Sequence, residues 1–161
     1  MKYVGAAVVG AALLCGLGSS FAQAQMAQYG ANLTLEQARK VVAGALAEAR
    51  RINVPMAIAV VDTSGNLVNF EKMDDTQFGS INVAIDKAVS SALFRRPTRA
   101  FQDGVASGGA GLLILQLRGA SPVEGGIPIT LDGKVVGAIG VSGGTLAQDA
   151  LCASAGVSAL K

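Results

Sequence analysis

Histidine and tryptophan are absent from all 161 residues of the chain, and only two cysteines occur. The lack of histidine excludes Ser-His-Asp and Cys-His catalysis, histidine-rich zinc sites and histidine-ligated haem iron. Cys15 lies in an N-terminal segment that we expect to be removed, so Cys152 would have no partner for a disulfide. Because Leu151 and Ala153 flank it in a predicted helix, we interpret Cys152 as a small core residue rather than a reactive thiol.

Charge is scarce at the N-terminus, where Lys2 is the one charged residue before position 25. Residues 4–17 are apolar, and Ala22-Gln23-Ala24 places small residues where a signal peptidase cuts. The apolar run is shorter than the about 20 residues that span a bilayer. We therefore predict a cleaved signal peptide over 1–24, a mature leader over 25–32 and one domain over 33–161. The leader would be loosely ordered or lie on a neighbouring chain, and the protein would be periplasmic or secreted, with no membrane span after cleavage.

The mature chain is almost neutral, since removal of Lys2 leaves 12 basic and 11 acidic residues. No basic run is long enough to follow the phosphates of a nucleic acid, so we expect no nucleic-acid partner. Apolar residues are plentiful, at 51% of the whole sequence, and 137 residues suit a single domain with its own core.

Local signals define an alternation of helices and hairpins. Capping boxes at Thr34–Gln37 and Thr145–Gln148 predict helices reaching about 51 and 155, and a further helix is expected over 80–94. An apolar run at 56–61 and an alternating, partly exposed strand at 67–72 enclose one turn, and Asp132-Gly133 forms a second turn before a buried strand at 135–141. The run 112–117 fits either a strand or a helical turn. This order predicts an α+β fold with one mostly antiparallel sheet of about five strands.

Helical spacing also predicts which side chains of two helices are buried. For the helix over 80–94 the predicted buried face consists of Ile81, Ala84, Ile85, Ala88, Ala92 and Leu93. For the last helix it consists of Leu146, Ala150 and Ala153.

Four stretches resemble a known family, the GlcG/HbpS-like proteins (haem-degrading domain), which also include the C-terminal part of PduO. They are LTLEQARK, VPMAIAVVDTSGNLVNFEKMD, AIDKAVSSALFRRPT and GGIPITLDGKVVGAIGVSGGTLAQD. The resemblance covers nearly the whole mature chain and implies a profilin-like α/β/α sandwich that forms homo-oligomers. Some relatives bind haem, and one is a secreted haem-binding partner of a sensor system. Others are encoded beside glycolate or propanediol enzymes.

Lys87 and the end of its helix carry the first candidate binding residues. Lys87 lies within the family-like motif and could hold a carboxylate such as a haem propionate or a small organic acid. The alternative is a solvated lysine paired with Asp86 or with a neighbouring turn. Arg95 and Thr98, beside Pro97, offer a carboxylate-binding fork and a hydroxyl, or else a charged helix end with Thr98 capping the next turn.

The glycine-rich region carries the second group. Ser142 and Gly143 precede a helix N-terminus, where free N–H groups favour an anion, but close packing of strand and helix is the interpretation that we favour. Asp62 and Asp132 are interpreted as turn formers and Asp149 as a helix first-turn charge. Glu124 is a carboxylate with no evident structural role.

We therefore expect a secreted or periplasmic, homo-oligomeric protein that binds a small ligand, with haem or a related tetrapyrrole the first to consider. The predicted binding residues are Lys87, Arg95, Thr98, Glu124, Gly125, Gly126, Ser142 and Gly143. Without histidine, the iron would need another ligand: Thr98, Lys87, Met73, Tyr29, Cys152 or a residue of a partner subunit.

Two alternatives stay open. One is an enzyme acting on a small acidic or carbonyl metabolite through Lys87 and a carboxylate such as Glu124. The other is a structural assembly module whose glycine-rich surface forms subunit contacts. No catalytic residue or metal site is assigned.

Overall fold

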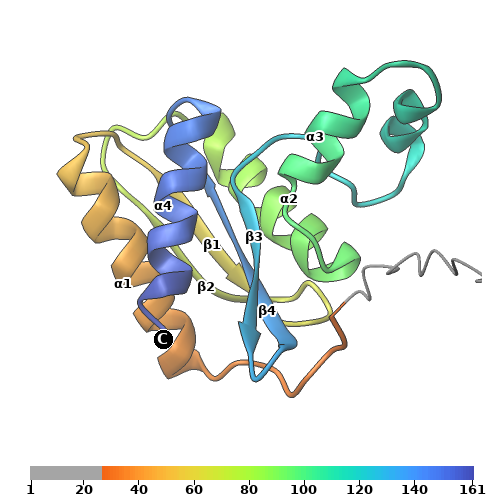
Figure 1. Cartoon of the computed structure of the whole chain (residues 1–161). Coiled ribbons are helices and arrows are strands. Elements are labelled where there is room, and N and C mark those ends of the chain that lie inside the picture. The colour runs from red at the N-terminus through yellow and green to blue at the C-terminus, as the bar shows by residue number, and fades with distance from the viewer. Residues whose placement is uncertain (1–26) are drawn as a thin grey trace, which may run out of the picture.

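The computed structural model describes residues 27–161, so the predicted signal peptide lies outside the described part. A four-stranded antiparallel sheet with strand order β2-β1-β4-β3 forms the middle layer. Helices α1 and α4 pack together on one face and α2 covers the other (Figure 1). The elements in chain order are α1 Leu35–Arg51, β1 Ala57–Val61, β2 Leu67–Lys72, α2 Gly79–Phe94, α3 Arg99–Ala106, η1 Gly109–Gln116, β3 Gly126–Leu131, β4 Lys134–Ser142 and α4 Leu146–Ser158.

The predicted α/β/α sandwich is confirmed, but the sheet has four strands and not five. Residues 112–117, which fitted a strand or a helical turn, belong to the 3₁₀ helix η1 and its end. Both predicted capping boxes are present, and positive φ angles at Asp132 and Gly133 form the predicted turn between β3 and β4. No helix within residues 27–161 is long and apolar enough to cross a membrane.

The two faces of the sheet are packed differently. The face under α1 and α4 holds the larger core, built from branched aliphatic side chains, and Cys152 is buried within it as predicted. Burial raises the pKa of the Cys152 thiol to about 11, which leaves little thiolate at neutral pH. The face under α2 holds a smaller core made mainly of alanines. Small side chains there let α2 approach the sheet closely.

The predicted buried face of α2 is only partly correct. Its three alanines are buried, but Leu93 is exposed and the two isoleucines are half-buried. The other buried residues are polar: Ser80, Lys87, Ser90 and Ser91. The physical reason is the close approach of α2 to β4, because a Cβ at Gly140 would overlap the carbonyl oxygen of Ala84. Only small side chains therefore fit where α2 lies over Gly140.

The predicted buried face of α4 is also only partly correct. Ala153 is buried, whereas Leu146 is exposed and Ala150 is half-buried. Asp149, Cys152 and Gly156 are buried instead. The helix runs to Ser158, and its Gly156 lies against α1, where a Cβ would come within 2.8 Å of the carbonyl oxygen of Val41.

The leader is fixed on its own chain where the structure describes it. The leader pairs with the first residues of β4. Val135 donates its N–H to the Gln28 carbonyl at 2.8 Å, and Gly30 donates its N–H to the Val135 carbonyl at 2.8 Å. Leu33 continues the pairing with the Val136 carbonyl at 2.9 Å. The expectation of a loosely ordered leader is therefore wrong for residues 28–32.

Candidate functional site

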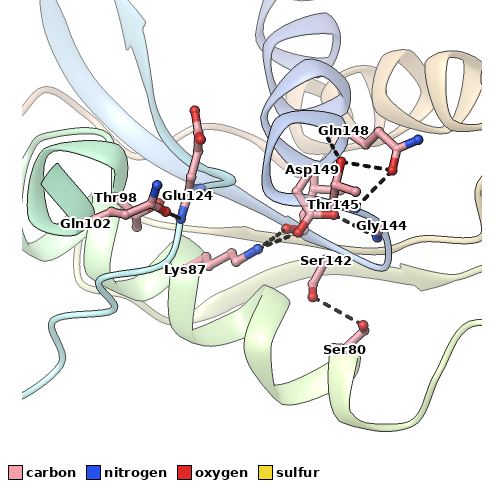
Figure 2. Close-up of polar contacts among 12 residues, drawn as sticks. Ser80, Lys87, Thr98, Gln102, Glu124, Ser142, Gly144, Thr145, Gln148 and Asp149 are labelled. Carbon is pink, nitrogen blue, oxygen red and sulfur yellow. Dashed lines mark hydrogen bonds and ion pairs between the residues drawn. The ribbon is translucent and has the colours of Figure 1, made fainter. Parts of the chain in front are cut away.

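Lys87 forms a buried ion pair that joins the two helical layers at one end of the sheet. Its Nζ lies 2.7 Å from Oδ2 of Asp149 at the start of α4 and donates to the Val141 carbonyl at 3.0 Å (Figure 2). The side chains of Lys87 and Asp149 are 1% and 3% exposed. The interpretation of Lys87 as a solvated partner of Asp86 is therefore wrong.

Asp149 accepts hydrogen bonds on both of its carboxylate oxygens. Oδ1 accepts the N–H of Gly144 at 3.0 Å, while Oδ2 faces Lys87. Burial raises the pKa of Asp149 above its usual value, and the Lys87 ammonium and the backbone N–H groups of Gly143 and Gly144 oppose that rise. Asp149 is thus a helix first-turn charge, as predicted, but a buried one with a partner.

This carboxylate occupies the position that the sequence offered to an external anion. The Gly144 N–H, at the N-terminus of α4, already points at Asp149. Gly143 is required by packing, because a Cβ there would overlap the Pro55 carbonyl oxygen. Ser142 donates its hydroxyl to Ser80 Oγ at 3.2 Å in a buried contact. Close packing of strand and helix therefore accounts for Ser142 and Gly143.

Gly125 and Gly126 cover the ion pair from β3. A Cβ at Gly125 would lie 2.9 Å from Lys87 Nζ, and one at Gly126 would overlap the Lys87 carbonyl oxygen. Gly125 also has a φ of +122°, which side-chain-bearing residues rarely adopt. These glycines lie beside Lys87, as the sequence predicted, but they close the space around it.

Thr98 attaches the beginning of α3 to β3. Its Oγ1 accepts the Gly126 N–H at 3.0 Å, and its own N–H donates to the Gly126 carbonyl at 3.0 Å. The side chain is fully buried and makes no capping hydrogen bond to α3, so the prediction that it caps the next turn is wrong. Nearby, Ser91 Oγ is the one buried side-chain polar atom in the described residues without a hydrogen-bond partner.

Glu124 lies close to this cluster in the chain but faces away from it. Its carboxylate accepts from Arg99 Nη1 at 3.0 Å, and Figure 2 shows it directed away from Lys87. Glu124 therefore has a structural partner that the sequence did not reveal.

Arg95 belongs to a different surface, formed with the leader. Its guanidinium carbon lies 5.0 Å from the centroid of the Tyr29 ring, and its Nη1 donates to the Ala27 carbonyl at 3.3 Å. The Tyr29 hydroxyl donates to the last turn of α2, at 2.9 Å to the Ala92 carbonyl and 3.0 Å to that of Leu93. Tyr29 is nevertheless 42% exposed.

Three shallow cavities of about 290 to 360 Å³ lie away from the ion pair. One of about 360 Å³ is lined by Leu46, Arg50, Glu71, Lys72, Met73 and Asp74. Within residues 27–161, no three His, Cys, Asp or Glu side chains gather closely enough to hold a metal ion.

The sequence missed Asp149 as the partner of Lys87, although α2 carried a signal. Ser80, Ala84, Lys87 and Ser91 recur at helical spacing and place the lysine on the face with small residues. A lysine on such a face lies against a neighbouring element and needs an acceptor there.

The architecture defines a class of small α/β/α domains with a packed polar centre. A family description, "Haem degrading protein HbpS-like", matches residues 33–158, and the chain belongs to this HbpS-like family. The resemblance that the four sequence stretches indicated is thereby confirmed.

Individual relatives agree. An uncharacterized 15.0 kDa protein from the dhaT-dhaS intergenic region of Citrobacter freundii is 40% identical over 126 residues, 76% of this chain and 88% of that one. A crystal structure of a double mutant of Streptomyces reticuli HbpS superposes with a TM-score of 0.75 at 28% identity. The match covers 98% of this chain and 99% of that one. The structure of a PduOC:heme complex superposes with a TM-score of 0.72 at 25% identity. The match covers 80% of this chain and 94% of that one.

Proposed function

We propose that the chain is a secreted or periplasmic, homo-oligomeric protein that binds haem or a related tetrapyrrole. The observation that carries the proposal is the family match over residues 33–158, together with a related domain whose structure is a haem complex. The signal-peptide pattern of residues 1–24 supports export.

The donor atoms of this chain narrow the choice of iron ligand. Of the five predicted candidates, Lys87, Thr98 and Cys152 are almost fully buried, and the first two are already hydrogen-bonded within the chain. Tyr29 is 42% exposed, and Met73 is half-buried beside a surface cavity. An iron at the surface can therefore meet one phenol or one thioether in the described residues without opening the core. To bind iron, the Tyr29 oxygen would have to give up its hydrogen bonds to the carbonyls of Ala92 and Leu93 at the end of α2.

Tyr29 is the better of the two donors. Tyrosinate is an established axial ligand of haem iron, and the Arg95 guanidinium beside the ring supplies positive charge. That charge can bind a haem propionate. The haem itself would supply the iron and the apolar macrocycle, and Tyr29 and Arg95 would bind and orient it.

A hemin titration of residues 25–161 tests the proposal. We expect a saturable change in the Soret band, which Tyr29→Phe abolishes or shifts and the control Met73→Leu leaves unchanged. Both substitutions preserve size, and circular dichroism should show that Tyr29→Phe, which also removes the hydroxyl's hydrogen bonds to α2, stays folded. An unsaturable spectrum in the unmodified chain would reject haem binding. An effect of Met73→Leu alone would instead show that Tyr29 is not the ligand.

Export is tested separately. N-terminal sequencing of protein from the periplasmic or secreted fraction should give Gln25 as the first residue. A protein that still begins at Met1 would contradict cleavage.

For the alternative of an enzyme using Lys87 and Glu124, the geometry offers no shared site. Lys87 Nζ bonds to Asp149 and the Val141 carbonyl, whereas Glu124 bonds to Arg99. The binding proposal is therefore the one that we develop.

A further inference from the structure

The segment between α2 and β3 exposes a row of leucines. We call residues 99–118, which contain α3 and η1, the leucine arm. Figure 1 shows this teal segment projecting from the side of the molecule that carries α2. In η1 no residue is buried, and the exposed fractions are 49% for Leu112, 61% for Leu113 and 61% for Leu115. Leu117, directly after η1, is 45% exposed.

The arm is nevertheless a defined structure and not an irregular loop. Its two helices meet at glycines, because a Cβ at Gly111 would overlap the Gly104 carbonyl oxygen. A Cβ at Gly104 would lie 2.5 Å from Ile114 Cδ1, and Ser107 Oγ donates to the Gly104 carbonyl at 2.6 Å. This packing turns Ile114 toward α3 and leaves the four leucines outside. The apolar surface is therefore formed before anything binds to it.

The eight-residue 3₁₀ helix η1 is supported by its contact with α3, while its leucines stay exposed. Runs of this helix longer than three or four residues are uncommon because their hydrogen-bond geometry is poor. Ordered apolar segments are normally maintained by burial, and an uninterrupted exposed apolar patch marks an interaction site. The leucines thus indicate a contact that one copy of the chain cannot supply.

The charge pattern indicates what covers them. Residues 104–117 contain no charged side chain, and Asp103 and Arg118 flank them with one charge of each sign. Segments that lie in a membrane surface are usually rich in lysine and arginine, and residues 104–117 contain neither. A patch without charge meets its own copy without like-charge repulsion, and symmetric pairing of identical patches is the commonest form of assembly.

We propose that the leucine arm is the surface through which a second copy of this chain docks. The inference rests on the homo-oligomer part of the proposed function and adds the residues of the contact. Leu113 and Leu115, the most exposed of the four, lie at its centre.

Native mass spectrometry and light scattering of residues 25–161 at micromolar concentration test the inference. The unmodified chain should be an oligomer, and Leu113→Asp/Leu115→Asp should reduce its subunit number. Two buried leucines contribute enough that we expect the dissociation constant to rise by roughly a hundredfold or more. The control is Leu35→Asp at the start of α1, where a leucine of 47% exposure lies in the other helical layer. It should keep the oligomer, and circular dichroism should show both variants folded.

The outcomes separate this inference from the proposed function. An oligomer that survives the double substitution rejects the arm as the interface but leaves the oligomer proposal standing. A monomeric unmodified chain rejects both. If the double variant keeps its subunit number but loses the hemin-induced Soret change, the leucines contact the ligand and the inference is wrong. If the unmodified chain binds neutral lipid vesicles through these leucines and stays monomeric, a membrane is the partner and the inference is again wrong.

Discussion

The Lys87–Asp149 pair and the leucine arm both reverse the usual placement of side chains, but in opposite directions. The first buries two charges, and the second exposes four leucines. Within the pair, the Val141 carbonyl, the Gly144 N–H and the close approach of Gly125 complete the surroundings. The leucines of the arm, in contrast, are not covered by the described residues of their own chain. The difference teaches that an exception satisfied internally is structural, whereas an unsatisfied one requires an outside partner.

The largest effect is expected when one charge of the buried pair is removed. Lys87→Met keeps much of the side-chain volume but leaves Asp149 buried without its counter-ion. We expect a loss of about 3–5 kcal/mol in the free energy of unfolding, measured by urea denaturation at pH 7.5. The control is Lys87→Met/Asp149→Asn, which removes both charges and retains an acceptor for the Gly144 N–H. It should recover much of the loss, and a double variant as unstable as the single one would contradict the ion-pair account.

The pH dependence of Lys87→Met gives a second, smaller test. Burial raises the pKa of Asp149, and without the ammonium the opposing effect is lost. Above the unfolded-state pKa, near the usual 3.8, the native carboxyl then holds a proton that the unfolded chain has released. Stability therefore falls as pH rises through this window. Denaturation midpoints should show less destabilisation at pH 4.5 than at pH 7.5, and equal losses would contradict the prediction.

The close contact of α2 with the sheet predicts an intermediate effect. Gly140→Ala places a Cβ against the Ala84 carbonyl and should cost about 1–3 kcal/mol, measured by thermal and urea denaturation. Gly79→Ala, at the open start of the same helix, has no atom within 4 Å of the new Cβ. This control should be neutral or slightly stabilising. Equal losses in both would mean that the contact does not limit α2.

The smallest expected effect belongs to the arm. Leu115→Ser should change the unfolding free energy of the separated monomer by no more than about 0.5 kcal/mol, because the side chain has little packing to lose. Urea denaturation at a concentration below the oligomer's dissociation constant measures it. A loss comparable to that of Gly140→Ala would show that the leucine is buried in its own chain, and the contrast between the two regions would disappear.

Features set by neighbouring residues were predictable from the sequence. The two capping boxes and the Asp132-Gly133 turn depend on side chains and dihedrals within a few positions, and all three are present. The layer arrangement followed from the resemblance, and the order of helices and hairpins agreed with it. The run 112–117 has no decisive period, so its 3₁₀ form could not be chosen from the sequence.

Features set by distant residues were not predictable. Lys87 and Asp149 are 62 positions apart, and the residues next to either one do not indicate that the two side chains pair. Glu124 and Arg99 likewise meet across 25 positions. The close contacts of Gly125, Gly126 and Gly140 depend on how near α2 lies to the sheet, which sequence periodicity does not measure.

The attachment of the leader has a consequence for the order of assembly. Tyr29 bonds to carbonyls 63 and 64 positions away, and its neighbours bond to Val135 in β4. A ribosome makes these residues first, yet their partners emerge much later, and contacts between distant segments form slowly. Residues 27–33 can therefore find their place only after most of the domain exists. The segment next to the predicted cleavage point is therefore synthesised early and docks late. As a result, the surface formed by Tyr29 and Arg95 is complete only at the end of folding, and a partner can bind it only then.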